Sequence, residues 1–466
     1  MGMPDYHEAT IAAIATPPGA GGIGIIRLSG RNSLAILRQL FQPKSSFPRF
    51  TSHKLYYGSL VNPRTGAVVD EVLGVYMRGP HTYTREDVVE IHCHGSYLVL
   101  EEILRLVLAF PGTRLADPGE FTKRAFLNGR IDLTQAEAVA DLLAAKTKEG
   151  ASLAVSQLKG GLHTEIERVR DFLLALRAII EVAIDFPEED VEILDGVALR
   201  QRLAGEALEP LRRLLARADE GRILREGVAV VILGRPNVGK SSLLNCLLRE
   251  ERAIVTEIPG TTRDTIEEYL DIGGIPIRLV DTAGIREAAE AVEEIGIRRA
   301  RQKLEEAELV LLVLDASAGV QEADRNLFAV TAGKKIVMVV NKIDQAEDGI
   351  LDDCERFFPG VPLAATSAKT GEGIAALEEV LKAVLIGEAA GLHEAGRPAP
   401  NARHVAALSR AVAALLRVEE GLAQALAPDL LAIDLQEALD HLGDIVGETT
   451  TDDVLDMIFA KFCIGK

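Results

Sequence analysis

The chain has only four cysteines among its 466 residues, Cys93, Cys246, Cys354 and Cys463, and they are scattered. This scarcity excludes a disulfide framework and fits a reducing compartment. The sequence also contains no run of about 18 apolar residues and no charged-then-apolar leader. We therefore expect a cytoplasmic protein that neither spans a membrane nor is exported.

Positive charge is scarce as well, since 51 Lys and Arg oppose 70 Asp and Glu and give a formal net charge of −19. A protein that grips nucleic acid by itself needs clustered Lys and Arg to neutralise phosphates. We therefore expect any RNA contact to be local or shared with a partner subunit. The length, with 48% hydrophobic residues, is sufficient for about three domains with cores of their own.

A phosphate-binding loop lies in the middle of the chain. Gly234-Arg235-Pro236-Asn237-Val238-Gly239-Lys240-Ser241 matches the pattern G-x-x-x-x-G-K-[ST] and follows the apolar run 228–233. The order predicts a strand, a loop whose backbone amides close around phosphates, and a helix that starts near Ser241. Lys240 would reach the β and γ phosphates, and the Ser241 hydroxyl would bind Mg²⁺.

Three further motifs follow in GTPase order, each after an apolar run: Asp281-Thr282-Ala283-Gly284, Asn341-Lys342-Ile343-Asp344 and Ser367-Ala368-Lys369. Asp281 is placed to hold the water shell of Mg²⁺. The Asp344 carboxylate can accept two hydrogen bonds from N1 and the exocyclic amine of guanine, a donor pair that adenine lacks. The set predicts a site for GTP rather than ATP.

The glutamine that usually orients the attacking water is missing, because Ile285 follows Gly284. With Asn237 and the switch Gly260-Thr261-Thr262-Arg263-Asp264, this looks like the translation-factor-related GTPases with a hydrophobic catalytic position. Hydrolysis then needs another way to orient water and another positive charge on the phosphoryl group. Carbonyls of Thr256-Glu257-Ile258-Pro259 can serve a monovalent cation, and glutamates in 285–296 belong either to a second switch or to a solvated acidic face.

The first 120 residues contain short strand patterns and two motifs that invite a binding site. Gly19-Ala20-Gly21-Gly22-Ile23-Gly24 matches G-x-G-x-x-G, but a strand pattern follows it and no acidic residue occupies the ribose position, which favours a glycine-rich connection over a dinucleotide site. His92-Cys93-His94 lies on one strand without a second ligand cluster, which favours sheet packing over a metal site.

Long helical patterns flank the G segment, from about residue 122 to 218 and again from 402 to 462. In the second stretch one apolar face is marked by Val405, Leu408, Val412, Leu415 and Leu416. We predict a multidomain α/β plus all-α fold: an N-terminal α/β domain (1–121), a helical domain in two parts (122–222 and 389–466), and an inserted Ras-like P-loop G domain (223–388).

Motifs outside the G segment carry a more specific resemblance. They are Ala15-Thr16-Pro17-Pro18-Gly19, Pro118-Gly119-Glu120-Phe121-Thr122-Lys123-Arg124, Ile184-Asp185-Phe186-Pro187, Asn401-Ala402-Arg403-His404 and Phe462-Cys463-Ile464-Gly465-Lys466. On these residues the chain resembles the MnmE (TrmE) family of tRNA modification GTPases over nearly its full length.

The resemblance implies that the N-terminal domain homodimerises and binds a folate one-carbon donor, 5,10-methylene- or 5-formyl-tetrahydrofolate. The implied folate contacts are Arg27, Glu90 and Lys466, while Arg130 stands where the family has a lysine. That replacement keeps the charge and changes the hydrogen-bond geometry. For Cys463, a reactive thiol near the folate and simple placement of the tail both remain open.

The resemblance also assigns roles in the G domain. The implied K⁺ ligands are Asn237, Thr256, Ile258 and Thr261, and the implied Mg²⁺ ligands are Ser241 and Thr262. Glu293 corresponds to the glutamate that orients the attacking water, so the implied catalytic set is Glu293, Lys240, Thr261 and Thr262. The implied GTP contacts comprise Asn237, Val238, Gly239, Lys240, Ser241, Ser242, Thr256 to Thr262, Asp281 to Gly284, Asn341 to Asp344, and Ser367 to Lys369.

The implied partners are a second copy of the chain, the FAD-dependent subunit MnmG in a heterotetramer, and tRNA. Together they would add a carboxymethylaminomethyl or aminomethyl group to carbon 5 of the wobble uridine, with hydrolysis activated by K⁺ and G-domain dimerisation. The alternative is a ribosome-assembly or signalling switch whose flanking domains only bind. Such a switch would carry an RNA-binding appendage between basic helices, whereas the run 429–456 is acidic.

Overall fold

The structure is a computed structural model that describes residues 9–17, 19–45, 49–185, 195–249, 253–254, 269–280, 304–346, 349–386, 397–460 and 462–466. The described residues divide into two compact units. One contains 9–140 together with 436–466, and the other contains the residues between 141 and 435.

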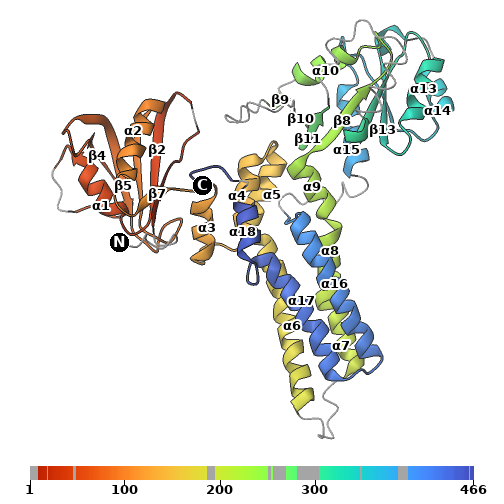
Figure 1. Cartoon of the computed structure of the whole chain (residues 1–466). Coiled ribbons are helices and arrows are strands. Elements are labelled where there is room, and N and C mark those ends of the chain that lie inside the picture. Colours follow the sequence, from red (N-terminus) through yellow and green to blue (C-terminus); the bar gives the residue numbers. More distant parts are fainter. Residues whose placement is uncertain are drawn as a thin grey trace. The chain divides into compact units, whose positions relative to one another are not determined.

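The first unit is built on a sheet of seven strands in the order β3-β4-β5-β6-β2-β1-β7 (Figure 1). Neighbouring strands are antiparallel except for β1 and β7, which are parallel. The strands are β1 (Thr10–Ile14), β2 (Gly21–Ser29), β3 (Phe41–Pro43), β4 (Lys54–Val61), β5 (Val68–Met77), β6 (Val88–Gly95) and β7 (Thr113–Leu115).

Alternation along the strands separates a core face from a second face. On β2, Ile26 and Leu28 are buried in one cluster with residues of α1 (Ser33–Leu40) and α2 (Tyr97–Leu108). Arg27, between them, points to the opposite face. There Ile11 and Ala13 of β1 pack with Phe121 of α3 (Glu120–Leu127). The alternation of side chains along β2 therefore places the charged Arg27 on the same face of the sheet as the ring of Phe121.

The end of the chain packs against α3 and α4 (Leu133–Ala144). Phe459 of α18 (Asp452–Phe459) and Phe462 lie in a cluster with Leu133, Ala136 and Leu455, and the two ring centroids are 5.4 Å apart. The Phe121 amide donates to the Lys466 carbonyl at 3.2 Å, and the Gly119 amide donates to the Cys463 carbonyl at 3.4 Å. The last residues are thus fixed at the start of α3.

The second unit contains another seven-stranded sheet, in the order β14-β13-β12-β8-β11-β10-β9. β11, β8, β12, β13 and β14 are parallel, and β10 is antiparallel to both of its neighbours. The strands are β8 (Val228–Leu233), β9 (Ala253–Ile254), β10 (Tyr269–Ile272), β11 (Ile275–Leu279), β12 (Leu309–Asp315), β13 (Lys335–Asn341) and β14 (Leu363–Ala365).

Helices cover both faces of this sheet, as a buried parallel sheet requires. Val230 and Ile232 of β8 pack in a cluster with α10 (Lys240–Arg249) and α15 (Ile374–Ile386). Val231 and Leu233 pack in another cluster with α14 (Ile350–Phe357), next to α13 (Glu322–Val330). The phosphate loop and the base-recognition loop both leave the carboxyl edge of this sheet, where α/β folds bind ligands.

The remaining elements of the described chain are helical: α5 (Lys148–Leu158), α6 (Gly161–Asp185), α7 (Gly196–Leu203), the π-helical turn Ala204–Leu208, α8 (Glu209–Ala216), α9 (Ala218–Glu226), the 3₁₀ turn Ile343–Gln345, α16 (Ala402–Ala423) and α17 (Pro428–Val446). In α16 the buried face contains Ala407, Leu408, Ala411 and Leu415, whereas Leu416 is 39% exposed. The prediction that Leu416 belongs to the core face was therefore wrong, because small alanines form much of that face.

The predicted fold class, α/β layers combined with a helical region, is confirmed. Within the described ranges, no helix combines the length and the hydropathy needed to cross a membrane.

Replacing Phe459 by Ala should lower the free energy of unfolding of the first unit by about 3 to 5 kcal/mol, because a nearly fully buried ring is removed from a packed cluster. Denaturant titration followed by circular dichroism measures this change. Met457→Ala is the matched control, since Met457 lies on the same helix and is 65% exposed. Equal losses in both variants would contradict the packing described for the tail.

Candidate functional site

The phosphate loop joins β8 to α10 through a backbone that its sequence permits. Gly234 and Gly239 have φ values of 155° and 98°, and Asn237 has a φ of 64°, which asparagine tolerates better than most residues. A Cβ atom on Gly239 would collide with the Asn341 carboxamide. The Lys240 ammonium donates to the carbonyls of Gly234 and Arg235 at 2.8 and 2.7 Å, which holds this cation at the loop.

The carboxamide of Asn341 connects the phosphate loop to the two loops expected to hold the base. Asn341 ends β13 and is 1% exposed. Its Nδ2 donates to the Val238 carbonyl at 2.8 Å, and its Oδ1 accepts from the Ala368 amide at 3.0 Å. A buried amide with both ends satisfied fixes the relative positions of three chain segments.

The carboxylate of Asp344, which is predicted to select the base, favours its charged form. The Ser367 hydroxyl donates to Asp344 at 2.7 Å, and this hydrogen bond lowers the pKa of the Asp344 carboxyl below its ordinary value. An ionised carboxylate is an acceptor only, which suits the paired N–H donors of guanine. Hydrogen bonds thus join Asp344 to Ser367 and Asn341 to Ala368, and the roles predicted for Asp344, Ser367 and Ala368 stay predictions.

Two ion pairs beside these loops were not anticipated. Lys342, with a φ of 64°, places its Nζ 2.6 Å from Asp315 at the end of β12. Burial raises the pKa of Asp315, but hydrogen bonds from Lys342 and Ser317 outweigh burial and lower the pKa overall. This pair binds the base-recognition loop to the neighbouring strand.

The other pair anchors the phosphate loop. Arg235 Nε lies 2.8 Å from Oδ1 of Asp324, whose side chain is fully buried. The second oxygen of Asp324 accepts from the Gln321 amide at 3.0 Å and caps α13. An acidic residue three positions after Gln321 is a recognisable helix-start signal, but its pairing with Arg235 depends on the fold.

Several predicted site residues lie outside the described residues, and their roles stay predictions. They are Thr256, Glu257, Ile258, Pro259, Gly260, Thr261, Thr262, Asp281, Thr282, Ala283, Gly284 and Glu293. Of the predicted cation ligands, the structure describes Asn237 and Ser241.

A second candidate site lies on the face of the first sheet that carries Arg27. Arg27 of β2 is in register with Glu90 of β6, and their Nε and Oε1 atoms are 2.8 Å apart. Arg27 also donates to the Gly465 carbonyl at 3.2 Å, and its guanidinium carbon lies 5.8 Å from the centroid of the Phe121 ring. A hydrogen bond with His92, and then the Arg27 ion pair, outweigh burial and lower the pKa of Glu90.

Arg130, the other arginine predicted to contact the folate, lies against an aromatic ring. Its guanidinium carbon lies 4.7 Å from the centroid of the Tyr83 ring, and the Tyr83 hydroxyl is 3.0 Å from Oγ1 of Thr122. Thr122 follows Phe121, the ring against which Arg27 lies. The structure thus places Arg27, Glu90 and the backbone of Lys466 near the start of α3, and Arg130 against Tyr83, which bonds to Thr122 of the same helix.

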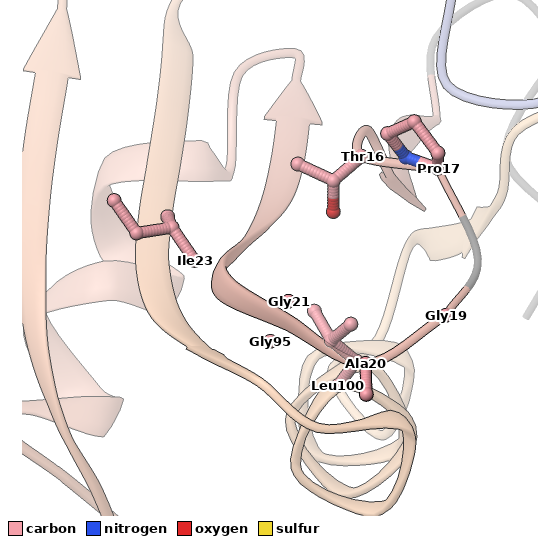
Figure 2. Close-up of a pocket in the computed structure, with 8 residues that line it drawn as sticks. All are labelled: Thr16, Pro17, Gly19, Ala20, Gly21, Ile23, Gly95 and Leu100. Atoms are coloured by element: carbon pink, nitrogen blue, oxygen red, sulfur yellow. The ribbon is translucent and has the colours of Figure 1, made fainter.

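The glycine-rich motif near the N-terminus was predicted to be a connection between elements, and its structure differs from that prediction. Gly21 to Gly24 belong to β2, with an irregular register between Gly21 and Gly24, because glycines let the strand bulge. Figure 2 shows the hollow beside it, about 260 Å³, lined by Thr16, Pro17, Gly19, Ala20, Gly21, Ile23, Gly95 and Leu100. The motif is followed by the rest of β2, and α1 begins only at Ser33, so the glycines do not lie at a helix N-terminus as they do in a dinucleotide site.

The side chains of the His92-Cys93-His94 segment contact other residues of the sheet or are buried in it. His92 lies 3.2 Å from Glu90, and Nδ1 of His94 lies 2.7 Å from Asp70. Cys93 is buried, and burial raises the pKa of its thiol to about 11. Across the described residues, no three metal-ligating side chains gather into a cluster.

Comparison with known proteins covers the whole chain. The family model described as "MnmE helical domain" matches residues 133–463, and that described as "GTP-binding protein TrmE N-terminus" matches residues 10–130. The tRNA modification GTPase MnmE of Desulfotalea psychrophila is 52% identical over 100% of both chains. That of Natranaerobius thermophilus is 46% identical over 98% of this chain and 100% of the relative.

Solved structures match part of the chain. The G domain of the T. maritima FeoB iron transporter is 29% identical, covering 34% of this chain and 98% of that chain with a TM-score of 0.26. Era from Aquifex aeolicus is 27% identical, covering 41% of this chain and 67% of that chain with a TM-score of 0.27. The assignment rests on the family models and the full-length relatives: this chain belongs to the MnmE family of tRNA modification GTPases.

Proposed function

We propose that the chain is a K⁺-stimulated GTPase that acts with the FAD-dependent subunit MnmG on the wobble uridine of certain tRNAs. The pair would add a carboxymethylaminomethyl or aminomethyl group at carbon 5, with a carbon taken from 5,10-methylene- or 5-formyl-tetrahydrofolate. The observation that supports this most is the coexistence, in one chain, of a guanine-nucleotide site and the Arg27–Glu90 site, across the full length of a tRNA modification family.

In the nucleotide site, each described residue has a defined task. Asp344 accepts from the guanine edge, and the amide of Asn341 keeps that loop at a fixed distance from the phosphate loop. Lys240 supplies a positive charge where the β and γ phosphates would bind, and the start of α10 directs backbone N–H groups toward them. Phosphoryl transfer depends on such positioning and charge stabilisation.

The residues present fit the expected cations. Ser241 lies in the first turn of α10 and offers a hard hydroxyl oxygen, which suits Mg²⁺. Asn237 lies in the loop with a φ of 64° and offers an amide oxygen for K⁺. Bound there, the cations would neutralise charge on the transferring phosphoryl group, which is the contribution expected in place of an arginine finger. Glu293 would orient the attacking water.

The Arg27–Glu90 site fits a folate for a chemical reason. A pterin ring carries the same 2-amino and ring N–H donor pair as guanine, and Glu90 is an ionised carboxylate because its pKa is lowered by His92 and Arg27. Arg130 and Lys466 would pair with the carboxylates of the glutamate end. The C-terminal residues stay at this site because Gly465 and Lys466 bond to Arg27 and Phe121.

The net charge supports a shared RNA surface. With a formal net charge of −19, the chain lacks the excess of Lys and Arg expected of a protein that holds tRNA alone. We therefore propose a homodimer that joins MnmG in a heterotetramer, in the cytoplasm, with tRNA bound by both subunits and GTP hydrolysis activated when two G domains meet.

Mass spectrometry of the wobble nucleoside tests the proposal. Unmodified tRNA is incubated with the chain, MnmG, GTP, K⁺, FAD, NADH, the folate donor and glycine or ammonium, and the expected product is the modified uridine. Lys240→Ala should abolish the product, because the phosphates lose their cation. An unchanged uridine in the complete mixture, with each component shown to be active, would refute the enzyme assignment.

Replacing Glu293 by Ala should lower the rate constant of GTP hydrolysis about 100-fold or more, the range seen when a positioned catalytic group is lost. The same assay in K⁺ and in Na⁺ should show faster hydrolysis in K⁺ for the wild type. Glu290→Ala is the matched control, since this glutamate lies in the same acidic segment. Hydrolysis at the wild-type rate in Glu293→Ala would show that another group orients the water.

A further inference from the structure

A hollow of about 490 Å³ opens in the first unit beside Arg130. The residues that line it are His53, Met77, Pro80, His81, Thr82, Tyr83, Arg85 and Arg130. Half of them carry basic side chains, in a chain whose overall charge is strongly negative. None of the lining residues that the structure describes is acidic.

The two arginines of this hollow differ from three other arginines of the same unit in the groups that they contact. Arg27, Arg114 and Arg124 form ion pairs with Glu90, Glu120 and Glu86. Within the described part of the chain, the Arg85 and Arg130 guanidinium groups contact a carbonyl and a ring instead of a carboxylate. Both arginines are exposed, and two guanidinium groups lining one concave surface create a positive potential that attracts an anion.

The acidic residues next to Arg85 in the sequence serve other contacts. Glu86 accepts from Arg124 and from the Ser29 hydroxyl. Asp87 accepts from the Gly79 amide at 3.0 Å. Glu86 is thus paired with a cation and Asp87 holds the loop at Gly79, while the lining of the hollow itself carries two guanidinium groups and no carboxylate.

The two guanidinium groups are held in place before any ligand binds. Arg85 donates to the Asn128 carbonyl at 2.9 Å, and the Asn128 side chain donates to the Thr84 carbonyl at 2.6 Å. Arg130 lies over the Tyr83 ring. Preorganised donors lose less entropy when they bind an anion, so these contacts favour binding.

The hollow shares one residue, Arg130, with the site proposed for the folate. Tyr83 bonds to Thr122, next to the Phe121 ring against which Arg27 lies. A folate whose pterin pairs with Glu90 and whose first glutamate pairs with Arg130 would direct the end of that glutamate into this hollow. Met77, Pro80 and Tyr83 provide an apolar wall for methylene groups, and Arg85 and the histidines provide partners for carboxylates.

We propose that this hollow binds the γ-linked glutamates of a polyglutamylated folate, so that the one-carbon donor is recognised by its tail as well as by its ring. The inference rests on the proposed folate function. Each added glutamate brings one more carboxylate. The concave shape and the presence of Arg130, which is also a proposed folate contact, favour this ligand over the phosphates of tRNA.

Isothermal titration of the full chain with 5-formyl-tetrahydrofolate carrying one or five glutamates tests the inference. At low salt the five-glutamate form should bind about tenfold more tightly, as expected from a few partly exposed charge pairs. Arg85→Ala should reduce this ratio to about two, and Arg85→Lys should retain most of it because the charge remains. Arg64→Ala is the matched control, since Arg64 is exposed in the turn between β4 and β5 and should leave the ratio unchanged.

The outcomes separate the two proposals. Equal affinity for both forms in the wild type would overturn the tail site and leave the folate function standing, whereas failure of both forms to bind would refute the folate function and the tail site with it. If Arg85→Ala keeps the ratio but weakens tRNA binding in a gel-shift assay, the hollow serves RNA and the inference is wrong. The ratio should also fall as salt is raised, because exposed charge pairs are screened.

Discussion

The carboxamide of Asn341 holds the guanine-nucleotide site together. It donates to the phosphate loop at Val238 and accepts from Ala368 in the loop that backs the base. Because the group is buried, an unpaired donor or acceptor there would carry the full cost of desolvation. The glycine at position 239 is required by the same contact, since a side chain there would occupy the space of the amide. The surrounding ion pairs, Lys342 with Asp315 and Arg235 with Asp324, stabilise each loop against a neighbouring strand or helix.

The Arg27–Glu90 site is also stabilised by an ion pair and hydrogen bonds between segments that are far apart in the sequence. Strand register places Arg27 opposite Glu90, and the last residues of the chain return to bond with Arg27 and Phe121. The aromatic cluster around Phe459 and Phe462 keeps that tail in place. Each candidate site contains a carboxylate with a lowered pKa, Asp344 in one and Glu90 in the other. Each is suited to a ring edge that presents two N–H donors.

The family, the enzyme class and the fold class could be predicted from the sequence because the motifs are contiguous and the strands beside them are strongly apolar. All three predictions are confirmed. Long-range partners could not be predicted. Nothing local in Arg235 indicates Asp324, and the charge of Lys342 does not indicate Asp315. The buried face of α16 was only partly predicted, since alanines rather than Leu416 fill it. Glycines 21 to 24 were expected to connect elements and instead bulge within β2. The assignments of Thr261, Thr262 and Glu293 remain predictions.

The affinity of the Asn341→Asp variant for GDP, measured by isothermal titration beside the wild type, tests the role of the buried amide most directly. A carboxylate at this position can still accept from Ala368, but it cannot donate to the Val238 carbonyl and would face it with like charge. The dissociation constant should rise about 10- to 100-fold, as expected for a buried acceptor left unpaired. A dissociation constant equal to that of the wild type, in a variant with unchanged circular dichroism, would contradict the account.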